Sequence, residues 1–495
     1  MRRRSDRAAE GAVAAFALTM AAAGVGCGGG HTALKTPTAS MVDGGVAAPV
    51  ETDQGQQVGV MAGPVADADL TGAAKSAYDR GFQAWVAGDL KTARDAFSDA
   101  ASKSSTSGGP RYSLGCVLER LGDVQGAQDA YRAAYSVNPR YDVAMGAYAL
   151  VLARSGHGQD AESFLAGKMN QNTDSVRLMA YLAEVKSIEG DSPGCQDMAQ
   201  KALAKQPDFK DAMVVIARDF YRNHKWDLAR YALQAVLDGP DDGSIPPRDK
   251  GNPEALLLRA LIERDSGQRK QALLDFAQAI AKRPDLFEAY INLGEMKLEA
   301  GNATEAQIPL EKATRYAPNV AVAHLDLGDC YRLLGRPGDA KKEFDTALGM
   351  DSTLAGAHYD LGLLYLFSST VPGVTGPDDQ LAKAIKELET YKSMRGAKTV
   401  KGQGDDVDEL LSTAKRKQNE LQMKKQAAAA APPAAAAPAT AAPATGVAKP
   451  GVAVAAPTPG AASKPAAGAA AAASASAVPA APAPSKGVIV RQLPK

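Results

Sequence analysis

The sequence predicts an all-α solenoid of stacked helix–turn–helix repeats with disordered segments at both ends, and three observations lead to it. Glycines recur regularly: Gly81 and Gly115, Gly294 and Gly328, and Gly328 and Gly362 share one spacing of about 34 residues. A unit of this length cannot bury its apolar face alone, so it is stabilised by stacking on its neighbours. Aromatic residues make up only 5% of the chain, which suits the close packing of small side chains. Both ends of the chain lack the apolar periodicity of folded elements.

Charge and cysteine content exclude several classes of protein. Lys plus Arg equals Asp plus Glu at 56 residues each, and this balance argues against a nucleic-acid-binding protein, which carries a basic excess. The four cysteines form no CxxC pair, so the spacings typical of zinc and thioredoxin sites are missing. Cys116, Cys195 and Cys330 fall in non-adjacent repeats, too far apart for disulfides. We expect these three to be small buried residues.

The first residues have the pattern of a secretory signal, and we assign residues 1–26 to a signal peptide. Arg2, Arg3 and Arg4 form a basic start, and an apolar run from Ala12 to Val25 follows. The run is too short for a comfortable membrane-spanning helix.

The apolar run ends in Gly24-Val25-Gly26-Cys27, which resembles the bacterial lipobox. The resemblance implies that Cys27 is acylated and anchors the chain to a bilayer without a spanning helix. Cleavage as an ordinary signal near Ala23 and retention as an uncleaved anchor are the alternatives. Residues 27–70, rich in Gly, Ala, Thr and Val, then read as a lipidated flexible tether.

The repeats carry a second pattern in phase with the glycines. In one unit it comprises Leu293, Gly294, Gly301, Ala306, Leu310, Ala313 and Pro318. The small residues let two helices touch, the larger Leu310 fills the space between repeats, and Gly301 suits a left-handed helix cap. The pattern resembles the tetratricopeptide repeat (TPR) family. That resemblance implies a right-handed superhelical solenoid.

About nine such units can be placed between residues 74 and 395. The third, around Ala149, is degenerate, the fifth is followed by an insertion from Gly239 to Asn252, and a loop from Ser368 to Pro377 separates the helices of the ninth. Residues 405–426 read as an amphipathic C-terminal capping helix, which open arrays require. Residues 427–495 are almost entirely Ala, Pro, Gly, Ser, Thr and Val, and we expect a disordered tail. Its short Val488-Ile489-Val490 segment is either a strand that pairs with a partner's sheet edge or an inert end.

The family resemblance implies a partner-binding groove lined by the first helix of each repeat. Carried over place by place, the candidate groove residues are Arg218, Tyr221, Arg222, Arg264, Glu288, Asn292, Glu295, Glu299, Asp326, Asp329, Arg332, Tyr359 and Asp360. The groove would then be basic in the middle and acidic toward the C-terminal end, a pattern that orients a partner. A merely hydrated inner wall is the alternative. We expect Glu295 and Asp329 to be exposed, so that reversing their charges weakens partner capture without unfolding the array.

No catalytic or metal-binding constellation stands out. His324 and His358 occupy one place on the first helices of successive repeats, where a core or rim histidine is the simpler interpretation than a metal site. HExxH and the Walker loop are missing, and we expect no GxSxG nucleophile elbow, which requires a strand-to-helix turn. A remote alternative places an enzyme site in the two insertions at Ser244, Ser368 and Ser369, with nearby acids. We expect no catalytic residues, no metal and no cofactor.

Together these features predict a scaffold or adaptor lipoprotein of the bacterial cell envelope. The predicted place is the periplasmic face of the outer membrane, in preference to the inner membrane, with other envelope proteins or peptides as partners in the groove and no nucleic acid. The layout resembles TPR lipoproteins of pilus assembly and, through its Ala/Pro-rich tail and long array, those of myxobacterial gliding motility. A regulator or recruiter of peptidoglycan-modifying enzymes and an outer-membrane biogenesis factor are the alternatives.

Overall fold

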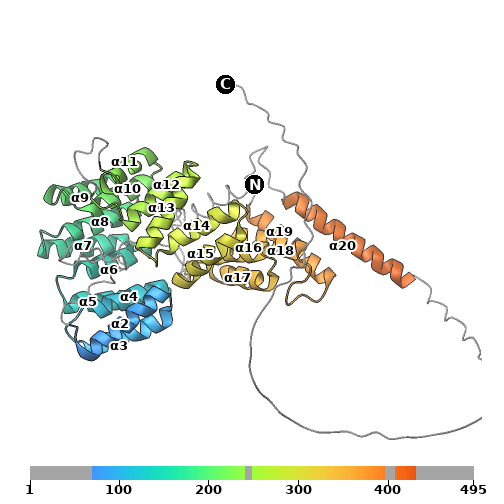
Figure 1. Cartoon of the computed structure of the whole chain (residues 1–495), viewed down its shortest axis with the longest axis horizontal. Coiled ribbons are helices and arrows are strands. Elements are labelled where there is room, and N and C mark those ends of the chain that lie inside the picture. The colour runs from blue at the N-terminus through green and yellow to red at the C-terminus, as the bar shows by residue number, and fades with distance from the viewer. Residues whose placement is uncertain (1–69, 240–247, 396–406, 431–495) are drawn as a thin grey trace, which may run out of the picture. The chain divides into compact units, whose positions relative to one another are not determined.

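The computed structural model describes residues 70–239, 248–395 and 407–430. Within these ranges the chain forms nine consecutive helix pairs and one further helix (Figure 1). We call the first helix of each pair helix A and the second helix B. The pairs are α2 (Gly72–Ala87) with α3 (Leu90–Lys103), α4 (Gly109–Arg120) with α5 (Val124–Val137), α6 (Asp142–Arg154) with α7 (Gly158–Gln171), α8 (Val176–Ile188) with α9 (Ser192–Lys205), α10 (Lys210–Arg222) with α11 (Trp226–Leu237), α12 (Pro253–Asp265) with α13 (Arg269–Lys282), α14 (Phe287–Glu299) with α15 (Ala303–Tyr316), α16 (Ala321–Leu333) with α17 (Pro337–Met350), and α18 (Ala355–Phe367) with α19 (Pro377–Arg395). The expected all-α repeat solenoid is confirmed, and the degenerate third unit forms a hairpin like the others.

The turns between helices A and B follow one backbone plan. Seven turns of the described ranges have a glycine in the left-handed region, with φ between 72° and 83°, as at Gly301 and Gly335. In the fifth repeat His224 takes this place with φ 55°. This left-handed conformation is unfavourable for a residue that has a Cβ atom, whereas glycine adopts it easily. Several helices B then begin with an aspartate cap, as where Asp89 accepts a hydrogen bond from the backbone N–H of Thr92.

In five of the nine described repeats, a large residue of helix B lies on a glycine of helix A. A Cβ atom added at Gly328 would lie 2.6 Å from the Phe344 ring, and one at Gly115 would lie 2.5 Å from the Tyr131 ring. Phe344 and Tyr131 are almost completely buried. The glycine spacing in the sequence therefore records the closest approach of two helices, which leaves no room for a side chain.

The array continues into a last helix, α20 (Val407–Ala430), which packs on α19. Its first two turns bury Val407, Leu410, Leu411 and Ala414, whereas the residues after Leu421 are exposed. Lys417 reaches back, so that its ammonium group lies 5.3 Å from the centre of the Phe367 ring. The first half of α20 thus covers the last helix pair.

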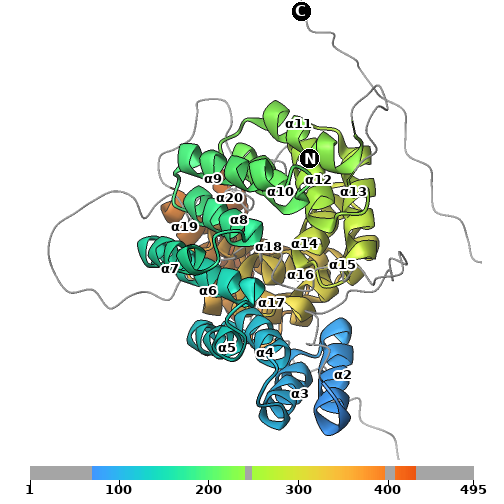
Figure 2. The ribbon, with the colours of Figure 1, turned by 90° about the vertical axis from the view of Figure 1, so that its left-hand side faces the viewer.

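Repeats far apart in the sequence also touch. One hydrophobic cluster combines residues of the first three repeats, such as Trp85 and Tyr112, with Phe287 of α14 and Tyr316 of α15. The Tyr316 hydroxyl donates a hydrogen bond of 2.8 Å to the carbonyl oxygen of Val86, at the end of α2. The array therefore curves so that its first repeat contacts its seventh (Figures 1 and 2).

Candidate interaction groove

The candidate groove residues lie on the A helices α10, α12, α14, α16 and α18, as the repeat pattern requires. Most of their side chains are buried in the array or paired with other side chains of the array. Tyr359 is buried and its ring packs against that of Tyr391, with 5.0 Å between the ring centres and a tilt of 57°, and Asp360 is only 1% exposed. The structure brings the candidates onto one helix layer but leaves few of their side chains open to solvent.

A chain of alternating charges runs through the middle repeats, which we call the central ionic network. It joins α8, α10, α12, the turn after α13 and the end of α4. Its members are Arg222, Glu184, Arg218, Glu254, Arg283, Asp285 and Arg120.

Arg218 is the hub of this network. Its guanidinium donates to Glu184 and to Glu254, each at 2.9 Å, although the residue is only 3% exposed. Burial raises the pKa of the Glu184 carboxyl, but Arg218 and Arg222 outweigh burial and lower the pKa to about 2. The expectation of a basic middle groove is therefore wrong, because acids of neighbouring helices neutralise its arginines.

The network ends where the array closes. Arg120 Nη2 donates to Asp285 at 3.4 Å, with both side chains almost fully buried. The Arg120 guanidinium carbon lies 4.5 Å from the centre of the Phe287 ring and 5.6 Å from that of Trp85. Burial lowers the pKa of Arg120, and Asp285 opposes that effect. Arg120 thus connects the second repeat with the seventh.

Arg264 organises the next part of the groove. Its guanidinium donates to the side-chain oxygen of Asn292 and pairs with Asp265 at 2.8 Å. Asp265 also accepts a hydrogen bond of 2.9 Å from the Tyr221 hydroxyl. Arg264 lies 3.9 Å from Glu295.

Glu295 is shielded rather than exposed. Burial raises the pKa of its carboxyl to about 7, Arg264 opposes the shift, and Glu299 reinforces it. Glu299 itself pairs with Arg269 of α13 at 2.6 Å, and Glu288 lies half-buried one turn before Asn292.

Asp329, which we also expected to be exposed, is buried. It is 4% exposed and pairs with Arg332 on the next turn of α16 at 2.5 Å. Asp326 lies half-buried on the same helix. The expected exposure of Glu295 and Asp329 is wrong, because neighbouring A helices pack over these places. A charge reversal there would change the fold as well as the surface.

Two apolar side chains remain open at the ends of the A helices. Leu333 of α16 and Phe367 of α18 are 44% and 60% exposed, and they occupy one place in successive repeats. The family resemblance also places Leu333 in the groove, whereas Phe367 was not among the residues predicted from the sequence. An alignment of the repeats could have revealed both residues. The equivalent places in the two preceding repeats hold the acidic residues Glu299 and Asp265, so a change from acidic to apolar at this place is visible in the sequence.

The two aligned histidines join helices within their own repeats. His324 Nδ1 lies 2.6 Å from a carboxylate oxygen of Glu343, and His358 Nδ1 lies 2.6 Å from one of Glu387. Each pair links helix A to helix B. Within the described ranges, no three metal-type side chains come together.

The cysteines of the array behave as expected. Cys116, Cys195 and Cys330 are buried, and none of these three forms a disulfide. Burial raises the pKa of the Cys116 thiol to about 12, which keeps the group protonated and unreactive. These residues therefore fill space between helices.

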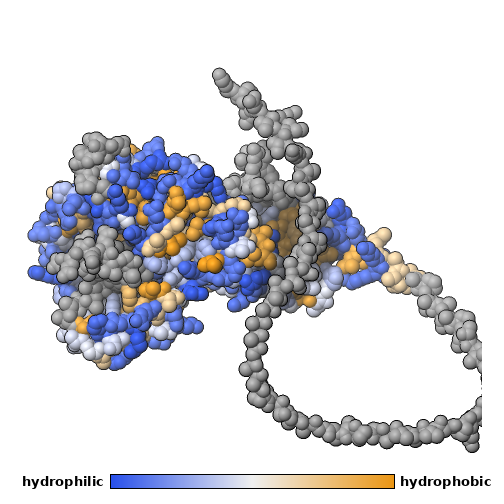
Figure 3. Space-filling model, in the orientation of Figure 1, coloured by the Kyte–Doolittle hydropathy of each residue, from blue (hydrophilic) through white to orange (hydrophobic). Residues whose placement is uncertain are grey.

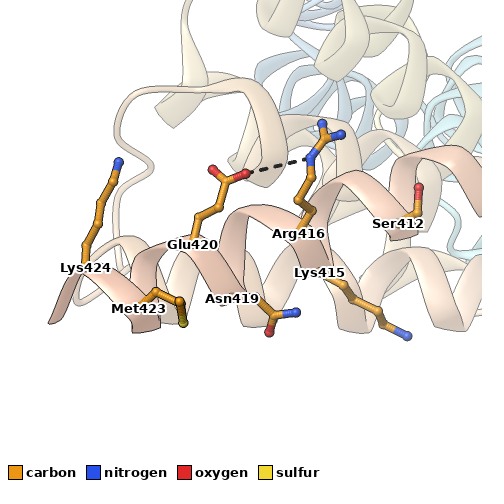
Figure 4. A pocket seen from close by; sticks show the side chains of 7 residues that line it. All are labelled: Ser412, Lys415, Arg416, Asn419, Glu420, Met423 and Lys424. Atoms are coloured by element: carbon orange, nitrogen blue, oxygen red, sulfur yellow. Dashed lines mark ion pairs between the residues drawn. The ribbon is translucent and has the colours of Figure 1, made fainter. Parts of the chain in front are cut away.

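The remaining surface features are modest. An open hollow of about 660 Å³ follows one face of α20 and is lined by Ser412, Lys415, Arg416, Asn419, Glu420, Met423 and Lys424 (Figure 4). Its residues come from a single helix, so it has no opposite wall. None of the helices in the described part of the chain is long and apolar enough to cross a membrane. The view in Figure 3 shows a mainly hydrophilic surface with separate apolar patches.

Some of the predicted features lie outside the described ranges. These are the signal peptide, Cys27 and the tether, Ser244, and the tail from residue 431 onward. Of the other residues suggested for an enzyme site, Ser368 and Ser369 lie in the loop after α18, and the nearby acid Asp249 pairs with Lys210 at 2.9 Å.

Comparison with known families identifies the repeat. The family model described as "Tetratricopeptide repeat" matches residues 110–141 and 321–354. These residues span the pairs α4–α5 and α16–α17. These two segments of the chain are tetratricopeptide repeats, and the other helix pairs of the described ranges follow the same helix–turn–helix plan. TPR arrays offer extended surfaces for protein partners and are generally not catalytic, so this chain has the architecture of a scaffold.

Individual relatives share only part of the TPR chain. Cellulose synthase operon protein C of Pseudomonas fluorescens (strain SBW25) is 29% identical over 122 residues, which are 24% of this chain and 10% of that protein. The chain thus spans about a tenth of the length of this curated relative.

Solved TPR structures show low identity. A tetratricopeptide repeat protein from Parabacteroides merdae is 16% identical, with 49% of this chain and 92% of that one covered and a TM-score of 0.31. The Cut9–Hcn1 structure is 14% identical, with coverage of 68% and 62% and a TM-score of 0.47. MamA is 20% identical, with coverage of 35% and 96% and a TM-score of 0.29.

Proposed function

We propose that this chain is a lipid-anchored TPR scaffold of the bacterial cell envelope that holds partner proteins on its A-helix layer. The nine stacked hairpins of the described ranges are the observation that carries the scaffold role. The lipobox-like Gly24-Val25-Gly26-Cys27 supports the anchor. Anchoring at the periplasmic face of the outer membrane raises the effective concentration of the array for envelope partners.

The partner contacts the C-terminal half of the A-helix layer. In the middle repeats the central ionic network already pairs the buried charged side chains with one another, so few of these charges are open to a partner. Leu333 and Phe367 are large, apolar and open, and buried apolar anchors supply most of the affinity in protein interfaces. Arg332, next to Leu333 on α16, adds a polar group at the rim that orients the bound segment.

The envelope machine that best fits the layout is gliding motility or pilus assembly. The long array and the Ala/Pro-rich end of the chain support this assignment. Recruitment of peptidoglycan-modifying enzymes and outer-membrane biogenesis remain the alternatives. The similarity to cellulose synthase operon protein C is confined to a short segment of that protein, so it supports a scaffold and not a role in cellulose synthesis. No catalytic step is part of this function.

The lipid anchor is tested by metabolic labelling. Cells that express the full chain are fed radiolabelled palmitate, and label is expected in the wild type but not in Cys27→Ser. Label retained in Cys27→Ser, or missing from the wild type, contradicts the anchor.

The partner site is tested by in-cell photo-crosslinking from position 333. The expected result is one or a few discrete protein adducts, reduced when Phe367→Asp is added. A crosslinker at Asp95, exposed on helix B of the first repeat, is the matched control. An adduct pattern that is the same from positions 333 and 95 contradicts the proposed surface.

A further inference from the structure

One place on the B helices differs between repeats in a way that the fold does not require. Each B helix has a fully buried small residue near its start, such as Ala229, Ala272 or Ala306. The residue two positions later points away from helix A and is exposed in all nine described repeats. In six repeats this place is polar, held by Asp95, Asp129, Ser163, Asp197, Lys342 and Lys386.

In the fifth, sixth and seventh repeats the same place is apolar. Tyr231 is 76% exposed, Leu274 56% and Ile308 64%. Leu228, one turn before Tyr231, is 48% exposed. Because equivalent places line up along the direction of stacking, these four residues form a line across α11, α13 and α15. We call it the B-helix stripe.

The size of the B-helix stripe matches the apolar part of a protein interface. A large apolar side chain presents roughly 200 Å² when fully open, so the exposed fractions of the four residues correspond to about 500 Å². A stable interface buries about 800 Å² on each partner, of which about 57% is apolar, or roughly 450 Å². One stripe therefore supplies the apolar area that one side of a stable dimer needs.

The layout of the stripe also suits two identical surfaces. Leu274 lies at its centre, with one large residue a repeat away on each side. A two-fold axis through Leu274 places the α11 end of one copy on the α15 end of the other, and each contact then occurs twice. The chain has no net charge, with 56 basic and 56 acidic residues, so two copies meet without long-range repulsion.

The charged residues around the B-helix stripe argue against its binding to a lipid surface. The charged residues one helical turn from Tyr231, Leu274 and Ile308 are Asp227, Lys270, Glu305, Glu311 and Lys312. Acids outnumber bases in this set, whereas surfaces that bind anionic membranes carry an excess of Lys and Arg. An apolar centre with a mixed polar rim is typical of a protein–protein contact.

We propose that the B-helix stripe is a self-association surface, through which two copies of this chain form a two-fold symmetric dimer. The dimer leaves the A-helix layers of both copies open for partners. It is independent of lipidation and of partner identity, so it stands or falls separately from the proposed function.

Sedimentation equilibrium of the purified full chain tests the dimer. The wild type is expected to be dimeric at about 100 µM, and Leu274→Asp is expected to weaken its Kd roughly 30- to 100-fold, as for the loss of a central anchor residue. Lys342→Asp, at the same place in the eighth repeat, is the matched control and leaves the Kd unchanged. Circular dichroism establishes that each variant keeps its helices. Ile308→Lys is the second variant and should also give monomers.

Crosslinking tests the symmetry. Leu274→Cys is expected to form an intermolecular disulfide on mild oxidation, and Lys342→Cys to give no more dimer than the wild type. A wild type that stays monomeric at about 100 µM, or a folded Leu274→Asp variant whose Kd changes less than about threefold, overturns the proposal. A monomeric Cys27→Ser chain, which lacks the proposed acyl anchor, that floats with phosphatidylcholine vesicles overturns it in favour of a lipid surface.

Discussion

At the scale of single residues, the balance between burial and ion pairing decides how the charged A-helix side chains behave. Glu184 and Glu295 are both shielded carboxyls, yet the pKa of Glu184 is lowered and that of Glu295 is raised. Two arginines outweigh burial at Glu184. At Glu295 burial prevails, because Arg264 is 3.9 Å away and already engaged with Asp265 and Asn292.

The raised pKa of Glu295 makes stability depend on pH. The folded chain holds this proton more tightly than the unfolded chain, so the contribution of Glu295 to stability is greatest below the unfolded pKa. It falls as pH rises from about 4.5 to about 7. Glu295→Gln keeps the neutral form at every pH, and we expect it to raise the free energy of unfolding at pH 8 by about 1–3 kcal/mol.

Urea denaturation of both proteins at pH 5 and pH 8 measures this effect. The difference between variant and wild type should be larger at pH 8 than at pH 5. Glu305→Gln, at an exposed side chain paired with Lys297, serves as the control with little change at either pH. Equal differences at the two pH values would show that Glu295 is ionised in the folded chain throughout this range.

At the scale of elements, the hairpin depends on the contact between a glycine of helix A and a large residue of helix B. A methyl group at position 328 would lie 2.6 Å from Phe344, so the two helices have to separate. We expect Gly328→Ala to lower the free energy of unfolding by about 1–3 kcal/mol, as other overpacked cores do.

Gly349→Ala provides the matched control for this prediction. Gly349 lies inside α17 with nothing within 4 Å of an added Cβ, so the same substitution should raise the free energy of unfolding by up to about 1 kcal/mol through helix propensity. Opposite signs in urea denaturation support the close contact. A Gly328→Ala variant as stable as Gly349→Ala would show that the glycine is not required by packing.

The hairpins were predictable from the sequence because their contacts are local and repeat in register. Gly328 and Phe344 belong to one hairpin, and Gly115 with Tyr131 repeats the same contact in another. The central ionic network was not predictable, because its members come from different repeats. Arg120 and Asp285 are 165 positions apart in the sequence, so their pairing depends on how the whole array curves. The expected exposure of Asp329 failed for the same reason.

At the scale of the whole array, the contact between its first and seventh repeats fixes the curvature. Arg120 lies between the rings of Trp85 and Phe287 and ends on Asp285. Removing the guanidinium leaves a buried carboxylate with reduced compensation. We expect Arg120→Leu to lower the free energy of unfolding by about 3 kcal/mol and to increase the radius of gyration, because the first repeats separate from the seventh.

Small-angle X-ray scattering and urea denaturation check this prediction together. Combining Arg120→Leu with Asp285→Leu should recover much of the lost stability, since no unpaired buried charge remains. Arg132→Leu, which removes an exposed pair with Asp129, is the control and should change the free energy of unfolding by less than about 1 kcal/mol. An Arg120→Leu protein with unchanged radius and stability would contradict closure through this residue.

The long stretch of chain between Arg120 and Asp285 also sets the order in which the array is completed. The N-terminal end of the chain is made first, and under the proposed function it is also exported first, so Arg120 is in place before its partner, which lies 165 positions later. During that interval the N-terminal hairpins can stack locally, but Trp85 and Tyr316 of the shared hydrophobic cluster have not yet met. A chaperone that shields the exposed apolar surface in the meantime therefore influences when the array acquires its final curvature.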